Sequence, residues 1–145
     1  RVVRVEDIIG YKFKNKMIGL QALKTSHDTQ PLYWQGIIMP VEKNRRLALV
    51  GDRALGLTLC ELWWNTKLDN GRYARLSTVL ESRKAMEKRA LALGLDYPIL
   101  ISDSKRVAVF EDIAETFEAI IGAVYIDSGK DLATVRTAVE RLGLE

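Results

Sequence analysis

The chain has 145 residues, of which 48% are hydrophobic and 28% are charged, and its formal net charge is +3. These values are typical of one globular domain, and the mild positive charge is compatible with a polyanionic partner. No apolar run reaches the roughly 18 residues that a membrane span requires, so we expect no membrane partner. The single cysteine, Cys60, excludes an internal disulfide and a cysteine-based zinc site.

We expect a single domain over residues 1–145, built from helices. A short helix over 5–10 ends at a glycine, and Asn15 is a suitable N-cap for a helix over 16–24. Residues 25–40 show no periodicity and predict an irregular loop. After the central stretch we expect helices over 72–80, 83–93 and 111–127, a loop over 96–107, and a last helix that Asp131 caps. No stretch alternates with period 2 for long enough to predict a strand, so the predicted fold class is all-α.

The stretch over 44–64 is long enough for one helix and is apolar on almost every side. Such a helix is expected in the middle of a domain. It contains Asp52, and an ionised carboxylate is rarely buried unless it is paired or bound to a metal. Asp52 therefore requires a partner, and that partner is the best route to the function.

Three acids in the second strongly apolar helix are candidates for that partner. Glu111, Glu115 and Glu118 follow i, i+4, i+7 spacing and share one stripe. The stripe is either a solvated face or a row of carboxylates that faces Asp52. In the second case the oxygen ligands suit Mg²⁺ or Mn²⁺, and a site of that kind hydrolyses phosphodiesters. Spacing alone leaves both interpretations open.

Four blocks of the sequence recur in the order known from one family. They are IGYKFKNKMIGLQAL, NRRLALVGDRALGL, NGRYARLSTVLESRKAMEKRALALGL and ETFEAIIGAVYIDSG. The chain resembles the ribonuclease III domain, and its second block is similar to a divergent fungal branch. The resemblance implies an all-α domain that forms a symmetric homodimer, acts inside the cell and cleaves double-stranded RNA by Mg²⁺-dependent hydrolysis. No double-stranded-RNA-binding domain is expected within this chain.

The resemblance also carries over candidate metal ligands, but the set is incomplete. The family signature E-R-L-E-F-L-G-D corresponds to residues 45–52, and Asp52 matches its last acid. Ala48 replaces the second glutamate and Arg45 replaces the first. The family's later D-x-x-E corresponds to Glu115 and Glu118. Asp52, Glu115 and Glu118 are therefore the expected catalytic and metal-binding residues, with Mg²⁺ or Mn²⁺ as the ion.

A further acid of the family pattern falls near Asn70, and the adjacent Asp69 is a candidate substitute. Loss of a ligand removes charge as well as geometry, and Arg45 could neutralise the remaining acids without a metal. The resemblance thus predicts a ribonuclease III-type domain with impaired cleavage. The alternatives are a non-catalytic RNA-binding or ribosome-associated assembly protein, and a dimeric scaffold without RNA.

Basic residues and one leucine complete the candidate list. Arg72 and Arg75 follow the turn nearest the acids, and with Arg45 and Arg46 they are the expected contacts to RNA phosphates. Simple solvation of exposed helix faces is the alternative for these residues. Leu49 occupies the position where the family places a side chain that inserts into the partner subunit, and packing in the core is its alternative.

Overall fold

The computed structural model describes residues 1–26, 31–67, 69–95, 98 and 110–143. Within these residues the chain forms mainly helices, which confirms the predicted all-α class. They are α1 (Val2–Ile9), α2 (Lys16–Ala22), α3 (Arg45–Trp64), α4 (Asn70–Leu80), α5 (Arg83–Ala92), α6 (Phe110–Asp127) and α7 (Leu132–Arg141). Almost all of the loop predicted over 96–107 lies outside the described residues. No helix in the described ranges is apolar over a length that would cross a membrane.

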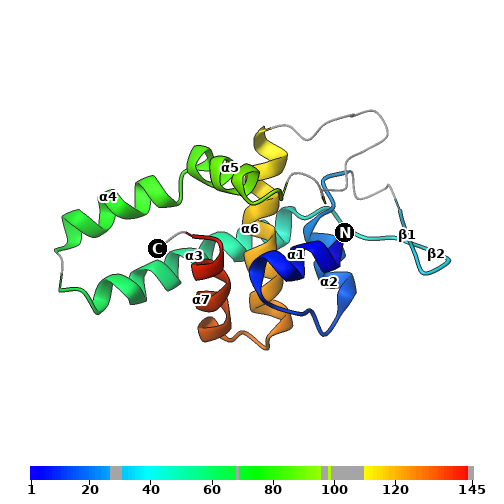
Figure 1. Cartoon of the computed structure of the whole chain (residues 1–145), viewed down its shortest axis with the longest axis horizontal. Helices are drawn as coiled ribbons and strands as arrows, with labels where there is room; N and C mark the ends of the chain where they lie inside the picture. Colours follow the sequence, from blue (N-terminus) through cyan, green and yellow to red (C-terminus); the bar gives the residue numbers. More distant parts are fainter. Residues whose placement is uncertain (27–30, 68, 96–97, 99–109, 144–145) are drawn as a thin grey trace.

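Helix α6 is the centre of the domain, and α2, α3, α5 and α7 pack around it (Figure 1). From Ile113 to Val124 every residue of α6 is buried except Glu115, which is partly exposed. The expectation that the 44–64 helix occupies the centre is therefore wrong. The second apolar helix, α6, occupies the centre, because four helices pack around it, whereas one side of α3 is exposed.

Helices α3 and α6 cross at two glycines, where their backbones nearly touch. A Cβ atom built on Gly51 would lie 1.7 Å from the carbonyl oxygen of Glu118, and one built on Gly122 would lie 2.0 Å from that of Leu47. Both distances are far below a van der Waals contact, and the obstructing atoms belong to the backbone. Glycine is therefore required at both positions, and the crossing fixes how the two helices face each other.

Only one side of α3 is buried. Leu47, Ala48, Ala54, Leu55 and Leu59 pack inward, whereas Leu49, Leu57 and Trp64 are exposed. The sequence pattern could not reveal this, because an apolar side chain looks the same whether its own chain or another molecule covers it. The C-terminal end of α3 and α4 project from the body as a two-helix arm (Figure 1).

A short hairpin corrects the expectation that the chain contains no strand. β1 (Leu32–Trp34) pairs antiparallel with β2 (Ile37–Met39), so that Tyr33 faces Ile38. Gln35 and Gly36 form the two-residue turn with φ values of 50° and 81°, the left-handed conformation that twisted hairpins favour. Strands of three residues are too short to produce a readable alternation, which is why the sequence pattern missed them.

Predicted caps fix the ends of two helices. The side chain of Asn15 accepts a hydrogen bond from Met17 N at 3.0 Å, and that of Asp131 accepts one from Ala133 N at 3.0 Å. Asp127, at the end of α6, accepts hydrogen bonds from the Tyr11 hydroxyl at 2.8 Å and from Lys14 N at 2.7 Å. The turn before α2 is thereby attached to the central helix.

Replacing Gly122 with alanine is expected to destabilise the domain by about 3 kcal/mol, because the backbone of α3 must move away to admit the methyl group. Gly71→Ala in α4 is the matched control, since the nearest atom to its Cβ is Asp69 Oδ1 at an ordinary 3.4 Å. That change should be neutral or stabilising by about 0.5 kcal/mol. Urea unfolding of both variants measures the difference, and equal midpoints would contradict the close crossing.

Candidate active site

The crossing of α3 and α6 brings three predicted acids together. Asp52 from α3 and Glu115 and Glu118 from α6 line one pocket of about 330 Å³. The same pocket is lined by Arg45, Ala48, Leu49, Glu81 and Arg83. The stripe of acids is therefore not simply a solvated face, at least for its second and third members. The side chain of Glu111, its first member, is outside the described part of the chain.

Glu118 is the most buried acid of the pocket, and its ionisation is strongly disfavoured. Burial, followed by the negative charge of Asp52, raises the pKa of Glu118 to about 7. Arg83 opposes this rise, while a hydrogen bond to Asp52 and the charge of Glu115 add to it. Glu118 therefore keeps its proton to a much higher pH than an exposed glutamate does.

Glu115 is compensated by a cation. Arg45 Nε lies 3.6 Å from Glu115 Oε1, and the side chains are 79% and 15% exposed. This distance makes an ion pair but is longer than a hydrogen bond. The expectation that Arg45 could neutralise an acid of the cluster thus has a direct geometric counterpart at Glu115.

The pocket does not fit a divalent ion as its side chains lie. Ala48 is buried one turn before Asp52, so no carboxylate enters the pocket from that position. Among the described residues, no group of three or more acids, imidazoles or thiols is arranged to hold one metal ion. Glu115 is paired with Arg45, and the raised pKa of Glu118 favours its protonated form, so both would have to reorganise before binding an ion.

The remaining predicted site residues lie outside this pocket or at its border. Asp69 is not one of its lining residues; it caps α4 by accepting from Arg72 N at 2.8 Å. The side chains of Arg72 and Arg75 are exposed on α4. Arg46 is exposed and pairs with Glu42 at 3.2 Å within the turn that leads into α3.

Glu81 and Arg83 are members of the pocket that the sequence pattern did not identify. They lie where α4 ends and α5 begins, and the side chain of Ser82 between them caps α5 by accepting from Ala85 N. That serine cap was a readable signal for a helix junction. Its position beside the α3–α6 crossing could not be read, because it depends on how α5 packs against α6.

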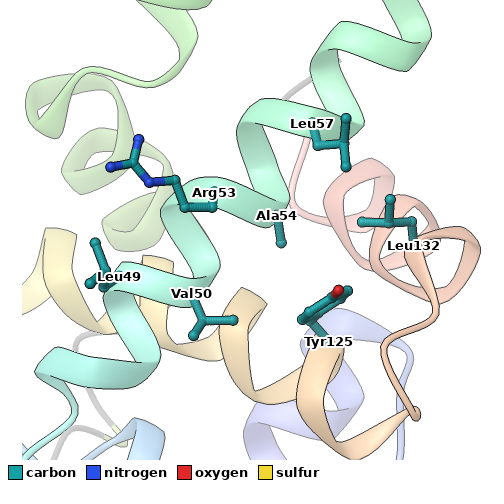
Figure 2. A pocket seen from close by; sticks show the side chains of 7 residues that line it. All are labelled: Leu49, Val50, Arg53, Ala54, Leu57, Tyr125 and Leu132. Carbon is teal, nitrogen blue, oxygen red and sulfur yellow. The ribbon is translucent and has the colours of Figure 1, made fainter.

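An apolar groove adjoins the acid pocket. It has a volume of about 380 Å³ and lies between α3, Tyr125 of α6 and Leu132 of α7 (Figure 2). Its α3 side is formed by Leu49, Val50, Arg53, Ala54 and Leu57. Leu49 lines both the groove and the acid pocket, so the exposed face of α3 reaches the edge of the site.

The raised pKa of Glu118 predicts a pH-dependent effect of Glu118→Gln. The unfolded state loses the Glu118 proton near the ordinary pKa of 4.5, whereas the folded state keeps it until about pH 7. This carboxyl therefore makes wild-type stability fall between those two pH values. The amide cannot ionise, so the variant should match the wild type near pH 4.5 and exceed its stability by about 2 kcal/mol at pH 8.

Denaturant unfolding from pH 4.5 to 8 measures this difference, because the other titrating groups contribute equally to both proteins. Glu140→Gln is the control, since Glu140 is exposed and pairs only with Arg136 across one turn of α7. The control should show no trend with pH beyond a few tenths of a kcal/mol. A gain for Glu118→Gln that is the same at every pH would show that burial does not disfavour this charge.

Comparison with known proteins supports the resemblance seen in the sequence. The sequence model of the Ribonuclease III domain matches residues 45–129, which contain the crossing and every lining residue of the acid pocket. Ribonuclease 3 of Rhodopirellula baltica is 28% identical over 141 residues, covering 94% of this chain and 50% of that protein. Ribonuclease 3 of Francisella tularensis subsp. novicida is 30% identical over 143 residues, covering 94% and 55%.

The fold agrees with the sequence. The nuclease domain of ribonuclease III from Campylobacter jejuni superposes with a TM-score of 0.80 at 25% identity, covering 98% of this chain and 95% of that one. A second structure of that nuclease domain gives a TM-score of 0.78. The chain spans about half the length of the curated relatives it matches. Because the matched segment is more than half of the chain and the whole fold agrees, the chain belongs to the ribonuclease III domain family.

Proposed function

We propose that this chain is a ribonuclease III-type domain that acts on double-stranded RNA, and that its metal-dependent cleavage of phosphodiester bonds is impaired. The observation that carries the proposal is the state of the three acids. The fold holds Asp52, Glu115 and Glu118 in one pocket, but a proton and Arg45 already compensate two of them. This arrangement supports a nuclease site of the family that keeps three acids together but alters their charge.

Asp52, Glu115 and Glu118 are the residues that would hold Mg²⁺ or Mn²⁺. Such an ion supplies Lewis-acid activation of water and of the phosphoryl group. Their present arrangement opposes this, because Ala48 offers no ligand and Glu115 faces a guanidinium. Asp69 does not fill the gap within one chain, since its carboxylate caps α4.

RNA contacts are proposed at the exposed arginines beside the pocket. Arg45 lines the pocket, while Arg72 and Arg75 lie on the arm that α4 forms. Arg46 is the weakest of the four candidates, because Glu42 already compensates its charge. Contacts of this kind bind phosphates without reading sequence, so binding should weaken steeply as salt is added.

A symmetric homodimer is proposed to cover the exposed face of α3. Leu49 and Leu57 are 60% and 50% exposed, and both line the apolar groove. The Campylobacter jejuni structure concerns a region involved in dimer formation of that nuclease domain. A second copy of this chain, with Leu49 placed in or beside the groove, would bury these side chains.

The alternative is a non-catalytic RNA-binding or ribosome-associated assembly protein that uses the same dimer. It is favoured by the acids missing at Ala48, Arg45 and Asn70, and disfavoured by the retention of Asp52, Glu115 and Glu118. A scaffold without RNA is the third possibility. Binding and cleavage assays on one preparation separate the three.

Cleavage of long duplex RNA tests the enzymatic proposal. With Mg²⁺, and separately with Mn²⁺, the wild type should cut slowly, and Ala48→Glu should accelerate cutting about tenfold or more by returning a ligand to the gap. The double variant with Arg45→Glu should gain further, because it also releases Glu115. Asp52→Asn in each background is the control and should abolish products that carry a 5′-phosphate.

Rapid Mg²⁺-dependent cutting by the wild type, unimproved by Ala48→Glu, would overturn the proposed impairment. Salt-sensitive binding with no cutting in any variant would favour the assembly protein. If the protein neither binds nor cuts RNA, the scaffold without RNA is the remaining possibility.

Substitution of Leu49 with glutamate tests the dimer. Because a charge on the exposed face of α3 would have to be desolvated, we expect the variant to be monomeric in light scattering at micromolar concentration, and the wild type to be dimeric. Val3→Glu is the matched control, since Val3 is 65% exposed on α1, outside the groove. A wild type that is itself monomeric, or a variant that still dimerises, would refute the interface.

A further inference from the structure

Two exposed arginines line the acid pocket from different helices. Arg45 comes from the first turn of α3 and Arg83 from the first turn of α5. Arg45 reaches Glu115 only at 3.6 Å, and the charge of Arg83 acts on Glu118. Within the described residues neither guanidinium donates a hydrogen bond, and both are exposed. Both guanidinium groups are therefore accessible to a group that enters the pocket.

Two cations lie among the acids of the pocket. Four acids line it, namely Asp52, Glu81, Glu115 and Glu118, and Arg45 and Arg83 offset half of their formal charge. The pocket therefore repels an anion less than four bare acids would, and the two guanidinium groups mark the part of it that an anion can approach.

We propose that Arg45 and Arg83 bind a backbone phosphate of duplex RNA at this pocket, so that the chain holds RNA there without a divalent ion. The inference rests on the proposed function and specifies which residues of the pocket contact the RNA. Guanidinium groups match phosphate oxygens in bidentate geometry and carry their charge at every physiological pH. The exposed pair of Arg45 with Glu115 is weak, so exchanging that carboxylate for a phosphate oxygen requires little free energy.

Four other arginines of the described chain are less suited to this role. Arg46 and Arg136 each pair at 3.2 Å with an acid four residues away, in Glu42 and Glu140. Arg89 and Arg141 donate to the backbone carbonyls of Gly143 and Asp7. Arg45 and Arg83 differ from these four because they line the acid pocket.

Fluorescence anisotropy with a labelled duplex RNA, measured over a range of KCl concentrations, tests the proposal on the whole chain. Binding is measured in EDTA and again with Mg²⁺ for the wild type, Arg83→Gln, Arg45→Gln and Lys84→Gln. Lys84 is the matched control, because it neighbours Arg83 on α5, is exposed, and does not line the pocket. All three substitutions remove one positive charge.

We expect wild-type affinity to be the same in EDTA and in Mg²⁺ within about twofold, apart from the screening that the ion itself causes. Arg83→Gln and Arg45→Gln should each weaken binding roughly five- to tenfold and lower the slope of log K against log salt by about 0.9. Lys84→Gln should change the affinity less than twofold and leave that slope within about 0.3 of the wild-type value.

Binding that requires Mg²⁺, or arginine variants that behave like Lys84→Gln, would overturn this inference and leave the proposed function intact. Absence of salt-sensitive RNA binding in both buffers would overturn the proposed function, and the inference with it.

Discussion

The near contact between the backbones of Gly51 and Gly122 is the constraint on which the site depends. A side chain at either glycine would separate α3 from α6, and the acids on the two helices would move apart with them. Because Glu118 O itself faces Gly51, the crossing places Glu118 beside Asp52 by geometry and leaves little freedom to relieve their repulsion. The raised pKa of Glu118 is thus a consequence of packing. The backbone contact sets the distance between α3 and α6, and the buried carboxyl groups held at that distance favour the protonated form of Glu118.

Sequence reasoning succeeded where a local rule acts and failed where burial depends on a distant neighbour. Asn15 and Asp131 cap their helices as predicted, because a cap involves only the next two or three residues. The meeting of Asp52 with Glu118 was one of two interpretations that the spacing left open, and the family resemblance selected it. The exposure of Leu49 agrees with one of the two interpretations given for it, whereas the presence of Glu81 in the pocket was not predicted, since it depends on which elements lie beside α3. The hairpin at Tyr33 was missed because three residues are too few for a pattern.

Leu49 connects association with chemistry in this fold. It contributes to the apolar groove on one side and to the acid pocket on the other, so a molecule that covers the groove also borders the acids. Covering that face would remove water from the pocket edge and strengthen every charge interaction inside it. The pairing of Arg45 with Glu115, which is weak while Arg45 is exposed, would then become stronger. The state of the acids in a dimer is therefore expected to differ from that in an isolated subunit.

The negative charges of neighbouring carboxylates in a pocket are compensated by bound protons, by cations or by solvent. All three occur in this pocket. Glu118 keeps a proton, Glu115 faces Arg45, and Asp52 remains partly exposed. Any divalent ion would have to displace that proton and that guanidinium before it gained ligands. Since the proton is held up to about pH 7, competition from it grows about tenfold for each pH unit below that value. Arg45 competes at every pH, because its charge cannot be removed by titration. Deprotonation of Glu118 alone would therefore leave Arg45 facing Glu115 and competing with a metal ion for that carboxylate.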